Sequence, residues 1–130
     1  MGVLIKGGTI VTAERTFRGD IYTEGETIKA IGENLDVPSK TETVDAGGCY
    51  VMPGGIDPHT QMESPFMETV SSEDFYSGTT AGAVGGTTMI LDVVIPGPQE
   101  DVLETYHKWM SWAEKSCLDY SFHIAITWWD

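Results

Sequence analysis

The sequence predicts an α/β fold in which a small β-rich part precedes alternating strands and helices. Three observations support this prediction. Short apolar segments punctuated by glycine fill residues 1–52, which is typical of a small sandwich or meander. A nearly unbroken apolar run covers residues 87–95, and an apolar helical face follows between residues 102 and 113. We therefore expect two parts, residues 1–52 and residues 53–130.

The first part is predicted to hold three strand pairs, each centred on glycine. Two short strands flank Gly7-Gly8, a turn signal. A second pair turns at Glu24-Gly25-Glu26, and a third surrounds Gly47-Gly48.

The second part begins where the rhythm changes at Pro53-Gly54-Gly55. A strand starting at Gly55 is predicted to run on to Gln61. Ser71, with Asp74 three residues later, resembles a helix-capping box, so we expect a helix that ends at Gly85-Gly86.

The apolar run at 87–95 fits a strand that is buried on both faces, as in a parallel sheet. A helix over 102–113 follows, with one face formed by Val102, Leu103, Tyr106, Trp109, Met110 and Ala113. Residues 120–129 predict a third strand. The order β-α-β-α-β indicates parallel pairing, and three strands leave an edge and an apolar face uncovered.

The charge and the cysteine content of the chain disfavour some classes of partner and of site. The net charge is -13, from 20 acidic and 7 basic residues, which disfavours binding to nucleic acid or to an anionic membrane. Cys49 and Cys117 form no C-x-x-C motif, so we expect reduced thiols. Because the N-terminus lacks the pattern of a signal peptide, we expect a cytoplasmic protein.

A candidate metal site lies where the first strand of the second part ends. His59 and Gln61 are two residues apart, so on a strand both side chains face the same side. A His-x-His pair at such a place would be a good start for a divalent-metal site. A glutamine amide is a much poorer zinc ligand than an imidazole.

These residues carry a family resemblance. The segment 54–62, GGIDPHTQM, resembles the G-G-I-D-x-H-T-H-x segment of the dihydropyrimidinase/D-hydantoinase branch of the amidohydrolase superfamily. Other features agree in order along the chain: the opening LIKGGTIVTAE, the segment 65–67, the helix start at 71–75, the stretch 83–88, and the segment 123–129. The match is specific because many separated features agree.

The resemblance implies a β-sandwich beside a TIM-like (β/α)8 barrel, of which residues 53–130 supply the first three βα units. It implies hydrolytic opening of a dihydropyrimidine or hydantoin ring by two zinc ions bridged by a carboxylated lysine and a hydroxide. Only the first ligand pair falls in this sequence, at His59 and Gln61. We therefore expect the N-terminal portion of a metal-dependent cyclic amidohydrolase, inactive alone and with weak or absent zinc binding.

The resemblance also suggests roles around this pair. Asp57 either orients a histidine as an outer hydrogen-bond partner or caps a loop. Met62, Phe66 and Met67 lie in the loop that shapes the substrate pocket in hydantoinases. The implied partners are a small cyclic amide and other copies of the chain in a homo-oligomer.

Other conspicuous residues receive structural interpretations. Asp92, within the apolar strand, is expected to be a hydrogen-bonded structural acid, with an outer role at the metal site as the alternative. His123 is expected in the core and His107 on the surface. The four tryptophans, at 109, 112, 128 and 129, are expected to pack, and neither cysteine is assigned chemistry.

Two other functions stay open. A non-catalytic dihydropyrimidinase-like scaffold or assembly protein would share the fold and lack metal ligands, although His59 remains here. Dihydroorotases carry H-x-H-x-R, in which the arginine pairs with a substrate carboxylate. Glu63 stands at that place and would repel such a substrate.

Overall fold

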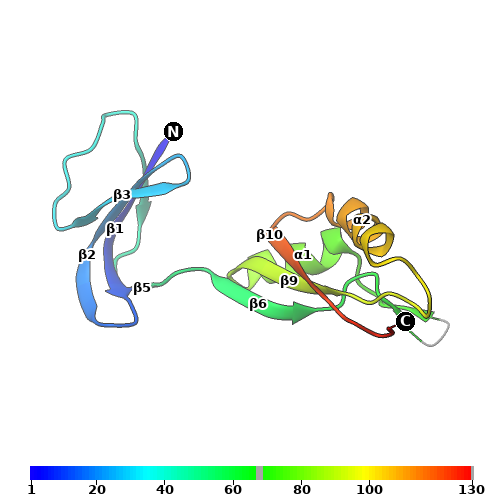
Figure 1. Cartoon of the computed structure of the whole chain (residues 1–130). Helices are drawn as coiled ribbons and strands as arrows, with labels where there is room; N and C mark the ends of the chain where they lie inside the picture. The colour runs from blue at the N-terminus through cyan, green and yellow to red at the C-terminus, as the bar shows by residue number, and fades with distance from the viewer. Residues whose placement is uncertain (67–68, 130) are drawn as a thin grey trace. The chain divides into compact units, whose positions relative to one another are not determined.

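The computed structural model describes residues 1–66 and 69–129, which form two units, Met1–Pro53 and Gly54–Asp130 (Figure 1). The first unit contains β1 (Gly2–Val11), β2 (Thr16–Glu24), β3 (Thr27–Gly32), β4 (Glu42–Asp45) and β5 (Tyr50–Val51). The second contains β6 (Gly55–Thr60), β7 (Pro65–Phe66), β8 (Thr69–Val70), α1 (Phe75–Val84), β9 (Thr87–Val94), α2 (Val102–Ala113) and β10 (Asp119–Ile124).

The first unit is built on one five-stranded sheet, with β1 at its centre. Its order is β3-β2-β1-β4, with β5 also paired to β1. β1 pairs antiparallel with β2, and β2 pairs antiparallel with β3 across the predicted turn at residues 24–26. Leu4, Ile10 and Ile21 are buried on this sheet.

The predicted break at Gly7-Gly8 is wrong. β1 is a single ten-residue strand, and the glycines form an irregularity in its pairing with β2 between Ile5 and Gly8. Gly7 has a φ of 74°, which a glycine adopts without steric cost, and its N–H donates to Asp20 Oδ1 at 2.8 Å. The side-chain acceptor replaces the lost ladder bond, so the strand continues.

The third predicted strand pair is also different. β4 and β5 do not pair with each other. Both run parallel to β1, β4 along its first half and β5 along its second half. Gly8 allows this close approach, since a Cβ placed there would lie 2.5 Å from Val51 Cγ2. β4 and β5 therefore act as one interrupted strand.

The second unit has a three-stranded parallel sheet of order β10-β9-β6. α1 lies between β6 and β9 in the sequence and α2 between β9 and β10, so the predicted β-α-β-α-β order is confirmed. The small hairpin β7–β8 precedes α1.

The start of α1 differs from the prediction in its capping residue. Asp74, not Ser71, is the N-cap, and its Oδ1 accepts from the Ser77 N–H at 2.7 Å while Ser77 Oγ accepts from the Asp74 N–H. Ser71 instead donates through its N–H to the Ser64 carbonyl. The helix ends at Val84 before Gly85-Gly86, as predicted.

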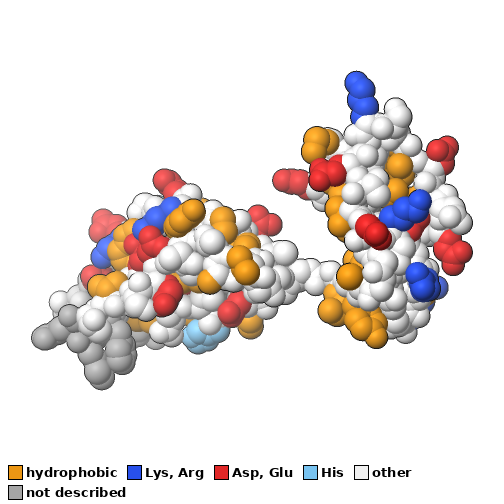
Figure 2. Space-filling view, turned by 180° about the vertical axis from the view of Figure 1, so that it is seen from behind, with side chains coloured by type: hydrophobic (Ala, Val, Ile, Leu, Met, Phe, Trp, Pro, Cys, Tyr) orange, Lys and Arg blue, Asp and Glu red, His pale blue; other side chains and the backbone are white. Residues whose placement is uncertain are grey.

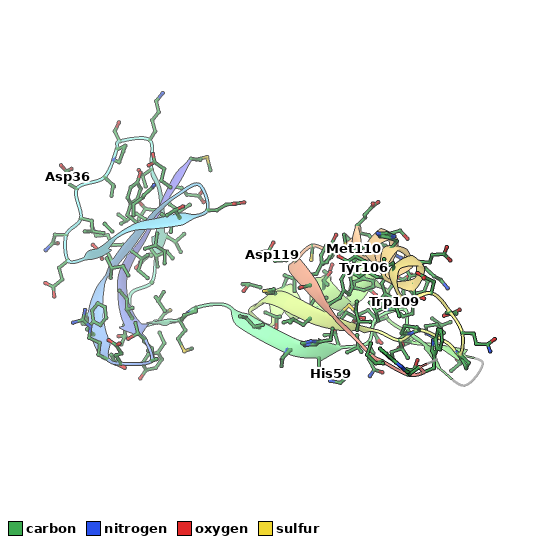
Figure 3. The ribbon with its side chains drawn as sticks, viewed as in Figure 1. Asp36, His59, Tyr106, Trp109, Met110 and Asp119 are labelled. Atoms are coloured by element: carbon green, nitrogen blue, oxygen red, sulfur yellow. The ribbon has the colours of Figure 1, made fainter. Side chains whose placement is uncertain are left out.

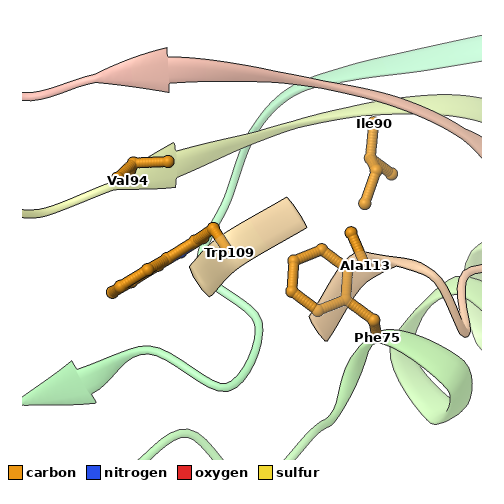
Figure 4. Close-up of a cluster of buried hydrophobic side chains, with 5 residues drawn as sticks. All are labelled: Phe75, Ile90, Val94, Trp109 and Ala113. Atoms are coloured by element: carbon orange, nitrogen blue, oxygen red, sulfur yellow. The ribbon is translucent and has the colours of Figure 1, made fainter. Parts of the chain in front are cut away.

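The core of the second unit lies between β9 and the two helices. Phe75, Ile90, Val94, Trp109 and Ala113 form one buried cluster (Figure 4). On β9 the even-numbered side chains are buried from Ile90 to Val94 and the odd-numbered ones are half-buried, so the predicted burial of both faces is wrong. The helices cover only one face of this sheet.

The apolar face of α2 is confirmed except at Leu103. Leu103 is 64% exposed, whereas Thr105 is buried and donates through its hydroxyl to the Asp101 carbonyl. That local bond satisfies the hydroxyl, which allows a threonine to occupy a core position.

The surface of each unit is acidic. Figure 2 shows Asp and Glu side chains spread over the visible face of both units. Among the described residues, no helix has the length and apolar character to cross a membrane.

Because Ile90 is in the core and Ile56 is on the surface, replacing each with valine should change the free energy of unfolding by different amounts. Ile90→Val removes a methylene from a side chain that is 2% exposed and should lower the free energy of unfolding by about 1 kcal/mol. Ile56→Val, at a side chain that is 61% exposed, should change it by less than about 0.5 kcal/mol. Urea unfolding of both variants measures this difference, and equal losses would contradict the assignment.

Candidate functional site

The candidate site lies at the carboxyl end of β6, where His59 is exposed to solvent (Figure 3). The pairing of β6 with β9 is irregular between Asp57 and Thr60. Pro58 lies within this stretch and has no N–H to donate, so a regular ladder cannot continue there. The strand end therefore has a bulged geometry that sets the direction of His59.

His59 and Gln61 meet, as their spacing predicts. The His59 Nε2 and Gln61 Nε2 atoms are 3.2 Å apart, and both residues are exposed. With the amide in this orientation, Gln61 donates to the lone pair of the imidazole. This is the same lone pair that a metal ion would need.

Asp57 contacts the backbone of the same turn. Its Oδ1 accepts from the His59 N–H at 3.1 Å, a bond that caps the bulge. A role for Asp57 in orienting an imidazole stays a prediction.

The donor set around His59 is too small for a metal ion. Across residues 1–66 and 69–129, no group of three His, Cys, Asp or Glu residues is arranged to hold a metal ion. A protein zinc site needs three or four protein ligands, whereas His59 and Gln61 supply at most two. The described residues therefore do not fit a metal ion by themselves.

Asp92 of β9 anchors the strand end beneath this pair. It is fully buried, and its Oδ2 accepts from Thr60 Oγ1 at 2.7 Å and from the Met62 N–H at 2.9 Å. Burial raises the pKa of this carboxyl, and the bonds from Met62 and Thr60 oppose that rise. The hydrogen-bonded structural acid expected from sequence is what the structure shows.

Glu63 ties the loop after β6 to the start of α1 and to Lys115, which follows α2. Its carboxylate accepts from the Phe75 N–H at 3.2 Å, at the start of α1, and pairs with Lys115 at 2.8 Å. Its own N–H donates to the Glu73 carbonyl. The hydrogen bond to Glu63 raises the pKa of Lys115. No sequence pattern indicates this anchor, because its partners lie 10 to 52 residues away.

The predicted substrate-pocket loop is described only in part. Met62 is half-buried and packs against the core cluster, so at least part of its side chain serves packing. Phe66 lies in β7, opposite Thr69, and Met67 is outside the described residues. The pocket role of all three stays a prediction.

Two structural expectations are wrong. His123 is exposed, because β10 alternates and turns Phe122 toward the core instead. Trp129 is 89% exposed. The expectations for His107, which is exposed, and Trp109, which is buried, are confirmed.

Sequence comparison gives close relatives along nearly the whole chain. Dihydropyrimidinase from Dictyostelium discoideum is 48% identical over 128 residues, which is 98% of this chain and 25% of that protein. D-hydantoinase from Geobacillus stearothermophilus is 46% identical, with 98% and 27% covered. Dihydropyrimidinase-related protein 5 from Mus musculus is 42% identical, with 98% and 23% covered. No family model matches the chain.

Solved structures agree with these relatives. The D-hydantoinase (dihydropyrimidinase) from Thermus sp. superposes with a TM-score of 0.94 at 45% identity, covering 98% of this chain and 28% of that one. A second D-hydantoinase structure gives a TM-score of 0.95 at 42% identity and covers the whole chain and 28% of the other.

The chain therefore matches an N-terminal portion of proteins named dihydropyrimidinase and D-hydantoinase, at 42–48% identity. It spans about a quarter of the length of the dihydropyrimidinase and D-hydantoinase relatives that it matches. Its mixed α/β fold resembles the corresponding part of the solved D-hydantoinase structures.

The raised pKa of Asp92 predicts a pH-dependent effect of Asp92→Asn. In the unfolded chain an aspartate loses its proton at its ordinary pKa, whereas folded Asp92 keeps the proton to higher pH. The folded state thus binds more protons in that window, and stability contributed by Asp92 is lost as pH rises through the folded pKa. The free energy of unfolding of Asp92→Asn, relative to the parent, should therefore increase with pH and then level off.

Urea unfolding of both proteins at a series of pH values, upward from the ordinary pKa of an aspartate, measures this change. Asp119→Asn, at an exposed carboxylate of β10, controls for the loss of one negative charge. Parallel stability curves for the parent and Asp92→Asn would refute the prediction.

Proposed function

We propose that this chain is the N-terminal portion of a metal-dependent cyclic amidohydrolase that opens dihydropyrimidine or hydantoin rings. One observation carries the proposal: relatives named dihydropyrimidinase and D-hydantoinase align over 98% of the chain at 42–48% identity. The exposed His59 at the carboxyl end of a parallel strand supports it, because barrel enzymes place their active sites at such ends.

In this proposal residues 1–52 are a sandwich portion and residues 53–130 are the first three βα units of a TIM-like barrel. The sequential strand order β6, β9, β10 with a helix at each crossover supports the barrel interpretation. The half-buried face of β9 supports it too, since a closed barrel would cover that face with its own interior side chains.

The roles follow the residues present. His59 would serve as one zinc ligand, and Gln61 would stand at the place of a second. Zinc in such a site activates water and polarises the attacked carbonyl. Because the described residues supply no third ligand, the remaining ligands must come from elsewhere, and we assign no hydrolytic step to this chain alone.

Partners and location are part of the same proposal. The substrate would be a small cyclic amide, and the protein would act in the cytoplasm. Copies of the protein would associate as a homo-oligomer, while the free edge of β10 would be taken by the next strand of the barrel.

A second candidate is a non-catalytic scaffold of the same branch. Two observations favour it. Gln61 stands where the resemblance expects a histidine ligand. Dihydropyrimidinase-related protein 5 is as similar, at 42%, as some relatives named dihydropyrimidinase. The two candidates differ in whether a metal ion is bound.

The direct test is an assay of the complete protein that carries this sequence. Zinc-loaded protein is incubated with dihydrouracil and with hydantoin, and ring opening is followed by the loss of ultraviolet absorbance. The hydrolase proposal expects turnover that disappears in His59→Ala and persists in His107→Ala, an exposed histidine of α2. Folded protein without metal or turnover would favour the scaffold.

Gln61→His should strengthen zinc binding in the complete protein. An imidazole replaces a weak amide donor, and the gain should exceed the roughly 10–100-fold effect of losing an outer hydrogen-bond partner. Metal content after dialysis against graded chelator measures the affinity. Gln99→His, in the loop before α2, is the control for an added histidine. Equal zinc retention in the parent and Gln61→His would show that position 61 is not a ligand position.

A further inference from the structure

Asp92 is the one fully buried carboxylate among the described residues, and its hydrogen bonds go to the segment that carries His59 and Gln61. Its Oδ2 receives the Thr60 hydroxyl and the Met62 N–H, the residues on either side of Gln61. Thr60 is also the last residue of β6 and follows His59 directly. Two hydrogen bonds to one atom thus bracket the candidate site.

These hydrogen bonds lie next to a stretch where the backbone pairing of β6 with β9 is irregular. β6 is irregular against β9 from Asp57 to Thr60, so backbone pairing alone does not fix this stretch. Asp92 is paired in register with Thr60 and therefore supplies, through its side chain, the restraint that the ladder lacks. Burying a carboxylate is costly, and an apolar residue would suit the surrounding core better.

The other carboxylate oxygen of Asp92 lacks such partners in the part of the chain that the structure describes. Asp92 Oδ1 and Trp109 Nε1 are both buried without a hydrogen-bond partner among the described residues. Trp109 is the largest side chain of the core cluster and lies against β9. The acid therefore sits where the site, the sheet and the helix meet.

We propose that Asp92 is a positioning residue that holds the segment from His59 to Met62 in the geometry that brings the His59 and Gln61 side chains together. The importance of that geometry for catalysis rests on the proposed function, but the restraint itself does not. Supporting hydrogen bonds of this kind keep site residues within a fraction of an ångström of working geometry.

The test uses the full chain and nuclear magnetic resonance. In Asp92→Ala, the imidazole signals of His59 should move toward those of a histidine without the Gln61 contact, while His107, on α2, keeps its signals. Hydrogen exchange of the Met62 amide should accelerate by about tenfold or more, since the variant removes the only side-chain acceptor that the described residues offer this amide. Asp92→Asn retains one acceptor oxygen and should partly restore both readouts.

Matched variants separate positioning from loosening of the core. Thr60→Val removes one donor and should shift His59 while leaving the Met62 amide protected; Thr60→Ser keeps the hydroxyl and should leave both unchanged. Val94→Ala removes buried volume from the same face of β9 and breaks no hydrogen bond, so it should leave His59 in place. If Asp92→Ala does not fold, the two Thr60 variants decide.

The proposal is overturned if His59 is unmoved in folded Asp92→Ala or in Thr60→Val, or if Val94→Ala shifts it equally. None of these readouts involves a metal ion or a substrate. A protein in which Asp92 restrains His59 but no ring is opened would refute the proposed function and leave this inference standing.

Discussion

The second unit depends on the burial of one face of β9. Ile90 and Val94 on this face lie between the helices and the sheet, where Phe75 and Trp109 complete the core. Each buried aliphatic side chain contributes on the order of 1.5–3 kcal/mol, so this face supplies much of the drive that orders α1 and α2 against the sheet. Asp92 stands between the two aliphatic residues and shares their burial, which turns the same packing into a support for the end of β6.

This coupling between core and site gives the loop after β6 a second kind of restraint besides backbone pairing. Asp92 restrains it from the sheet, and Glu63 restrains it from the first N–H of α1 and from Lys115. Both anchors are carboxylates, but their settings differ. Glu63 and Lys115 remain partly exposed, where an ion pair contributes little. The buried bonds of Asp92 are harder to replace, because losing them leaves polar groups unpaired in the core.

The structure therefore shows which residues support the candidate site, namely Asp92 and Glu63, but the part of the chain that it describes shows no complete set of ligands for a metal ion. His59 and Gln61 are exposed, and the described residues offer no third metal ligand. The D-hydantoinase relatives are about four times longer than this chain, so about three quarters of their length has no counterpart here.

Local patterns in the sequence were enough to predict the order of elements in the second unit, the end of α1, the hairpin at residues 24–26 and the pairing of His59 with Gln61. These features depend on glycine punctuation, an apolar period and a spacing of two. Other features arise only from contacts in the folded chain. Gly7-Gly8 became a bulge because Asp20 accepts the freed N–H, and Asp74 displaced Ser71 as the cap because Ser71 bonds to Ser64. The anchoring by Asp92 and Glu63 joins residues 12 to 52 positions apart, and such distant contacts leave no periodic trace in a sequence.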